Sequence, residues 1–226
     1  MVSDYFGYNA QVYLGCLGII VHELSHLVVA LLFGHKITDF KLIILPKKDR
    51  TNKILGYVNH IWNTNSNYQN IGNLFIGVAP VIGCSLIIYG IIKTIFLKDI
   101  SSWNNIGEFI ISHNFNYLYQ LILEFFVSFN HPNFAQVIAL IIIINIVIGG
   151  FDLSEADLRS TKSAFTIIVL IVTLTIMTIS LIGGNKIILA YASNFAISIL
   201  IVFFIPLLIA FVVLIVIWSC KFFILK

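Results

Sequence analysis

Charged residues are scarce in this chain. Only 10% of its 226 residues are Asp, Glu, Lys or Arg, against about 25% in a typical soluble domain. Hydrophobic residues make up 59% of the chain, and the mean hydropathy is +1.01. The net charge of +3 is too small to indicate a nucleic-acid partner. The composition therefore argues against an ordinary soluble domain and predicts an integral membrane protein that lies in a lipid bilayer.

Cysteine is also rare. The three cysteines, Cys16, Cys84 and Cys220, form no C-x-x-C pair, which argues against a disulfide framework and against a thiolate zinc site. The first apolar stretch has no basic region before it, so we expect no cleavable signal peptide and a first span that is retained.

Long apolar stretches dominate what remains. A spanning helix needs about 20 predominantly apolar residues. Such stretches cover residues 11–33, 71–96, 134–150, 163–182 and 188–218. We therefore predict an all-α polytopic membrane protein with about five transmembrane helices, forming a single membrane-embedded domain over residues 1–226. The amphipathic stretch 115–129 has two interpretations, an interfacial helix or a sixth span.

Basic residues predict the orientation, because cytoplasmic loops collect Lys and Arg. A five-span arrangement with the N-terminus outside leaves Lys93, Lys98 and Lys186 on the outer side. It places the other ten of the thirteen basic residues on the cytoplasmic side: Lys36, Lys41, Lys47, Lys48, Arg50, Lys53, Arg159, Lys162, Lys221 and Lys226. This asymmetry favours five spans over six.

The segment 36–62 contains two stretches rich in β-branched and aromatic residues, "ITDFKLIIL" and "ILGYVNHIW". The intervening "PKKDRTN" holds Pro, Asp and Asn, which are common turn residues. The pattern predicts two strands around a basic turn, a short β-hairpin-like segment at the cytoplasmic face. The alternative is an irregular cytoplasmic loop.

His22, Glu23 and His26 spell H-E-x-x-H inside the first predicted span. Residues four apart lie on one face of a helix, so the two imidazoles can bind one zinc ion. Glu23 lies beside them and can take a proton from zinc-bound water. Ionisable groups inside a span are costly and indicate function. The alternative is that the three side chains pair with one another or line a proton path.

Three segments together carry a family resemblance. "HELSHLVVALLFGH" in the first span, "GYVNH" in the strand-rich loop and "GVAPVIG" in the next span resemble the site-2 protease family of intramembrane zinc metalloproteases, most closely its small bacterial members. The resemblance implies zinc, peptide hydrolysis within the membrane, a membrane-protein or peptide substrate, and a multi-pass location in a bacterial cell membrane. It also implies that His22 and His26 are zinc ligands and that Glu23 is the catalytic base.

The family commonly takes its third zinc ligand from an Asp after a later span, and the corresponding region here is "NIVIGGFDLSEADLRS". We assign Asp157 as the third ligand. The S-x-x-D pattern that begins at Ser154 predicts a helix start and puts Asp157 on a rigid first turn. Asp152 is the alternative, and we expect it to be less fixed because it follows two glycines; Glu155 is a weaker option. A purely structural role for Asp157 is to cap that helix and favour its dipole.

The remaining polar residues are less specific. Asn59 and His60 either face the substrate or catalytic water, or are polar residues at a strand end. His35 lies near a predicted loop and needs no role. Gly77, Pro80 and Gly83 fit close packing between helices, since small residues let backbones approach.

These predictions converge on a zinc-dependent intramembrane endopeptidase with Glu23 as general base. Two other functions fit the same composition: a metal-ion carrier, or an inert relative acting as a regulatory or binding subunit. A carrier needs a polar path, yet the last two predicted spans offer only Ser, Thr and Asn as polar groups. An intact H-E-x-x-H argues against the inert relative. Substrate selection then falls to the membrane part itself or to regulatory membrane partners.

Overall fold

The computed structural model describes residues 8–45, 54–96, 114–127 and 132–159, with isolated positions at 112 and between 166 and 219. This part of the chain is mostly helical and contains a two-stranded antiparallel sheet. The spans predicted at 163–182 and 188–218 lie largely outside the described residues.

Two long apolar helices form the centre of the structure. They are α2 (Tyr8–Leu32) and α3 (Asn67–Ile91), and α3 continues into the π-helix η1 (Ile92–Phe96). Both are long and apolar enough to cross a membrane, with peak mean hydropathies of 1.9 and 2.3.

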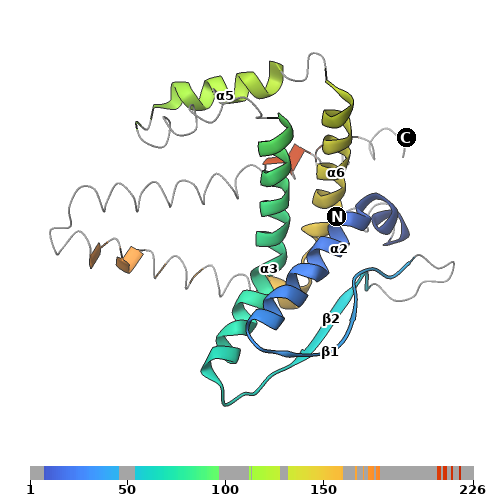
Figure 1. Ribbon diagram of the computed structural model, residues 1–226, viewed down its shortest axis with the longest axis vertical. Coiled ribbons are helices and arrows are strands. Elements are labelled where there is room, and N and C mark those ends of the chain that lie inside the picture. The colour runs from blue at the N-terminus through green and yellow to red at the C-terminus, as the bar shows by residue number, and fades with distance from the viewer. Residues whose placement is uncertain are drawn as a thin grey trace.

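Two shorter helices are also described, and a further helical stretch covers residues 155–159. α6 (Phe134–Gly150) has the predicted bounds but is only 17 residues long, and α5 (Phe115–Val127) occupies the predicted amphipathic stretch. Figure 1 shows α3 and α6 side by side, with α2 crossing them near one end.

The predicted strands are confirmed. Helix α2 is followed by Gly34 at a φ of 71°, a left-handed conformation that favours glycine and ends the helix. β1 (Lys36–Lys41) then pairs antiparallel with β2 (Tyr57–Ile61), from Lys36 opposite Ile61 to Lys41 opposite Tyr57. Both strands are shorter than the apolar stretches that predict them, and the pair lies against α2.

Helix α2 is broken at Gly15, whose φ of −127° and ψ of 19° are not helical. The break frees backbone N–H groups, and Asn145 on α6 accepts two of them. Its Oδ1 lies 2.8 Å from the Leu17 nitrogen and 3.4 Å from that of Gly18. Asn145 therefore caps, from another helix, the half of α2 that carries the H-E-x-x-H motif.

Small residues allow the helices to approach closely. A Cβ added at Gly15 would lie 2.7 Å from the Gly149 nitrogen, and one added at Gly18 would lie 2.5 Å from the Gly150 nitrogen. Gly83 on α3 packs against Ser25 in the same way, which confirms the predicted close packing of the second span. These contacts bring α3 and α6 onto the face of α2 that carries the histidines.

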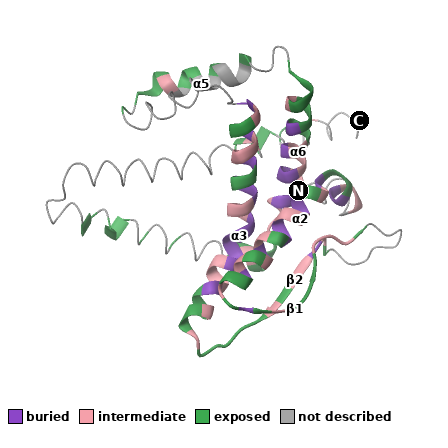
Figure 2. Cartoon of the chain, viewed as in Figure 1, coloured by how far each residue is buried: buried purple, intermediate pink, exposed green. Residues whose placement is uncertain are grey.

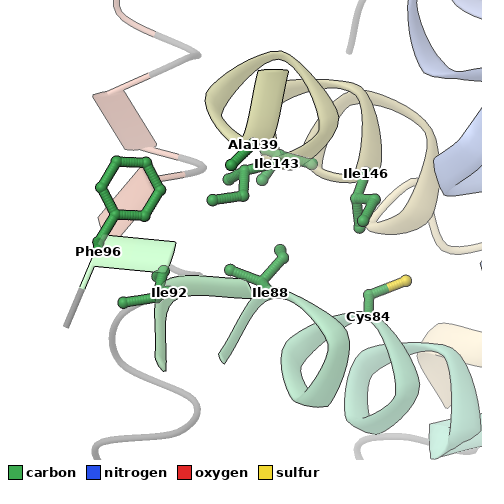
Figure 3. Close-up of a cluster of buried hydrophobic side chains, with 8 residues drawn as sticks. Cys84, Ile88, Ile92, Phe96, Ala139, Ile143 and Ile146 are labelled. Atoms are coloured by element: carbon green, nitrogen blue, oxygen red, sulfur yellow. The ribbon is translucent and has the colours of Figure 1, made fainter. Parts of the chain in front are cut away.

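A hydrophobic cluster joins α3 and η1 to α6 (Figure 3). Its buried members are Cys84, Ile88, Ile92, Phe96, Ala139, Ile143, Ile146 and Val147. Figure 2 shows buried residues where α2, α3 and α6 meet and exposed residues on their outer faces. The packed centre thus fixes the three helices against one another next to the motif.

Candidate metal centre

The two motif histidines are held by backbone carbonyls of the neighbouring helices. His22 Nδ1 lies 2.9 Å from the Gly150 oxygen, and His26 Nδ1 lies 2.8 Å from the Ile76 oxygen. A carbonyl oxygen only accepts, so Nδ1 donates in both rings. In neutral imidazoles the lone pairs then belong to the Nε2 atoms. The close helix packing therefore fixes both rings with their Nε2 atoms as acceptors.

The two lone pairs face each other. His22 Nε2 and His26 Nε2 are 3.2 Å apart, and the Asp157 carboxylate lies beside both. Asp157 Oδ1 is 3.4 Å from His26 Nε2, and its Oδ2 is 3.7 Å from His22 Nε2. When both rings are neutral, none of these atoms offers a proton to another, and all three side chains could serve as ligands of one metal ion.

The spacing fits a zinc ion. Tetrahedral zinc with nitrogen and oxygen ligands at about 2.0–2.2 Å puts neighbouring ligand atoms roughly 3.3–3.5 Å apart. The group formed by His22, His26 and Asp157 has its ligand atoms within 4.8 Å of one another. The measured separations of 3.2, 3.4 and 3.7 Å are close to that requirement.

Asp157 both caps a helix and faces the histidines. Ser154 Oγ donates to Asp157 Oδ2 at 2.6 Å, and the Asp157 N–H donates back to Ser154 Oγ at 3.2 Å, which confirms the predicted helix start. Burial alone would raise the pKa of Asp157, but hydrogen bonding to the two histidines and Ser154 outweighs burial and holds the pKa below its usual range. The carboxylate is therefore ionised, as a metal ligand must be.

The alternative carboxylates lie apart from this group. Asp152 has a buried partner that the sequence did not predict: Gln11 Nε2, fully buried on α2, donates to Asp152 Oδ2 at 2.5 Å. This partner comes from a helix 141 residues away in sequence. Glu155 is almost fully exposed and lies 3.7 Å from Arg159. Among the described residues, only the Asp157 carboxylate joins the histidines.

Glu23 lies beside the group and against the sheet. It is 8% exposed, and Gly56, just before β2, packs directly onto its side chain. A Cβ at Gly56 would lie 2.6 Å from Glu23 Cγ and 2.9 Å from the Lys41 carbonyl oxygen. Only a residue without a side chain fits there with Glu23 in this position.

A cavity of about 510 Å³ opens onto these residues. One wall comes from the H-E-x-x-H motif, Asp152 and Asp157, and the other comes from β2 and the residues before it, including Val58 and His60. Glu23 therefore shares a cavity with the metal-binding group, and the sheet forms part of the surface that a ligand would contact.

The contact between His35 and His60 was not predicted from the sequence. His35, for which no role was predicted, is 3% exposed and hydrogen-bonded to His60, with 2.9 Å between the two Nδ1 atoms. Asn59 is exposed, whereas His60 is half-buried and lines the cavity. The strand register of the structure pairs Ile37 with His60 and so brings His35 to the same end of the hairpin.

Comparison of the chain with models of known protein families, with curated proteins and with solved structures found no match.

Proposed function

We propose that this protein is a zinc-dependent intramembrane endopeptidase, similar to the site-2 protease family, that cleaves membrane proteins or membrane-bound peptides. The observation that carries the proposal is the convergence of two imidazole lone pairs and one carboxylate beside a second carboxylate, Glu23, in one cavity. Such a constellation is typical of metal-assisted peptide hydrolysis.

The outer faces of the helices support a place in the bilayer. On α2, Leu14, Leu17, Leu24, Val28 and Leu31 are all exposed in the described part of the chain, although they are large and apolar. Contact between such apolar faces and lipid chains carries no free-energy cost, whereas exposing them to water would be unfavourable. We propose a multi-pass protein of about five spans in a bacterial cell membrane, with the hairpin on the cytoplasmic side.

His22 Nε2, His26 Nε2 and an Asp157 oxygen would hold the zinc ion. When bound, zinc supplies a Lewis acid that polarises a peptide carbonyl and lowers the pKa of water towards 7. The carbonyls of Gly150 and Ile76 orient the two rings, and such supporting hydrogen bonds contribute to metal affinity.

Glu23 acts as the general base. It directly follows His22 and precedes His26 by three residues, and its side chain lines the same cavity without belonging to the metal-binding group. Glu23 takes a proton from the attacking water and delivers it to the amine that leaves. Gly56 leaves room for this carboxylate and limits where it can lie.

The free edge of β2 would bind the substrate. The Leu55 carbonyl accepts from the Ile44 N–H on the β1 side, and backbone groups alternate between the two edges of a strand. The backbone groups of Gly56, Val58 and His60 therefore point to the free edge. A peptide unwound from its helix would pair there and regain backbone hydrogen bonds.

Metal content and cleavage measured together test the proposal. The purified full chain should contain near-stoichiometric zinc and cleave an apolar helical peptide in detergent. Asp157→Asn should lose most of the zinc and all cleavage. The matched control Glu155→Gln alters an exposed carboxylate on the same turn and should keep both, and Asp152→Asn should keep both at least in part.

Each alternative function gives a different result. A metal-ion carrier would bind metal but cleave nothing, and an inert relative would show no cleavage in any variant. A zinc-replete, active Asp157→Asn protein would remove Asp157 from the metal centre.

A further inference from the structure

His35 and His60 form a hydrogen-bonded chain with a fixed direction. His35 Nε2 lies 2.9 Å from the Gln69 carbonyl oxygen, which only accepts, so this nitrogen donates. In a neutral ring His35 Nδ1 must then accept, and it accepts the proton of His60 Nδ1 at 2.9 Å. Trp62 stacks on the His35 ring with an interplanar angle of 16° and helps to hold it.

This series of hydrogen bonds leaves a lone pair on the other nitrogen of His60, Nε2. Burial lowers the pKa of His60, and the imidazoles of His35 and His26 lower it further, so the ring is neutral at neutral pH. With Nδ1 donating to His35, Nε2 is an acceptor. No described residue offers a hydrogen bond to this nitrogen, and His60 lines the cavity.

The strand places His60 at a distance from the reacting bond. Side chains at positions two apart share one face of a strand, so Gly56, Val58 and His60 face the same way. Gly56 contacts Glu23, and a residue four positions further lies roughly 13 Å along the strand. A peptide paired with the free edge would set one of its side chains beside His60, with Cβ atoms about 5 Å apart.

We infer that His60, oriented by His35, forms a subsite that selects a substrate side chain with a hydrogen-bond donor, about four residues from the cleaved bond. This inference rests on the proposed function. Ser, Thr and Asn can donate to Nε2, whereas Val would leave a half-buried acceptor unpaired. One neutral hydrogen bond corresponds to a preference of about three- to tenfold. His60 binds the substrate side chain, His35 is the positioning residue that orients His60, and Glu23 remains the general base.

A Thr-for-Val scan tests the subsite, because the two side chains have nearly the same shape. The probe is an apolar Leu- and Ala-rich peptide with a fluorophore and a quencher, carrying Val or Thr at each position in turn. Its cleavage is measured with the zinc-loaded full chain in detergent, and its binding with the Glu23→Gln variant. One position should prefer Thr by about three- to tenfold in both measurements. His60→Leu should abolish that preference, whereas Asn59→Ala, an exposed neighbour on the opposite face, should keep it.

A second comparison tests the direction of the hydrogen bonds. O-methylserine accepts but cannot donate, so the wild-type protein should discriminate against it relative to Ser at the same position. His35→Phe keeps an aromatic ring but frees His60 to carry its proton on Nε2, where it would donate rather than accept. The preference for Ser over O-methylserine should therefore become smaller. The wild-type comparison uses no protein variant and therefore remains decisive if His60→Leu does not fold.

The outcomes separate the two proposals. Cleavage that survives Glu23→Gln, or no cleavage at all, overturns the proposed function and the subsite with it. Glu23-dependent cleavage without any His60-dependent Thr preference overturns the subsite alone. Equal handling of Ser and O-methylserine by the wild type also overturns it.

Discussion

Gly56→Ala should damage catalysis without removing the metal. The added Cβ would lie 2.6 Å from Glu23 Cγ, 2.9 Å from the Lys41 carbonyl oxygen and 3.0 Å from Glu23 Oε1, whereas ordinary contacts begin at 3.4 Å. The Glu23 side chain or the strand must therefore move by 3.4 − 2.6 = 0.8 Å at the closest contact. A misplacement near 1 Å costs about 100-fold in rate. We expect kcat/KM to fall by about 10- to 100-fold.

The assay combines peptide cleavage with zinc analysis of the same preparation. Zinc content should stay at the wild-type level, because Glu23 is not one of the three metal-binding side chains. Gly90→Ala is the matched control, since a Cβ at Gly90 meets no atom within 4 Å. Gly56→Ala activity within twofold of the wild type would refute the idea that Gly56 sets the position of the base.

Three further predictions concern the cap, the strand edge and the topology. Asn145→Ala removes the acceptor for two N–H groups of α2 and should lower the free energy of unfolding by about 1 kcal/mol. The Tm in detergent should then fall by about 2–4 °C, and an unchanged Tm would mean that the cap does not contribute to stability. Val58→Pro removes a free-edge N–H and should reduce peptide cleavage while zinc stays bound, and undiminished cleavage would exclude pairing at this edge. Single cysteines at Lys48 and Ser160 in a cysteine-free background should resist impermeant thiol reagents in intact cells, whereas one at Ser102 should react; labelling of position 48 from outside would reverse the orientation.

Local patterns in the sequence predicted the parts of the site that depend on spacing along one element. The four-residue separation of His22 and His26 places both rings on one face of α2. The three-residue separation of Ser154 and Asp157 gives the capped turn that presents the Asp157 carboxylate to the two histidines.

The sequence could not predict contacts between distant segments. No partner for Asp152 was predicted from the sequence, yet the buried amide of Gln11 donates to it from α2. His35 looked irrelevant because it follows a helix end, yet the antiparallel pairing brings it to His60. Each contact depends on the packing of two elements, which neither residue's neighbours in the chain reveal.

The same limit applies to the position of Gly56. In the sequence it is a glycine before a strand, which could simply belong to a turn. In the structure it is the contact point between the sheet and Glu23. That contact is visible only once the sheet is placed against α2.

Glu23→Gln in the purified full chain tests the central claim most directly, with zinc content and peptide cleavage measured on one sample. Gln has the size of Glu but cannot take up a proton in the working pH range, and Glu23 lies outside the metal-binding group. We predict wild-type zinc content and loss of cleavage to background. Substantial cleavage by the zinc-replete variant would contradict the account, because Glu23 would then not be the base.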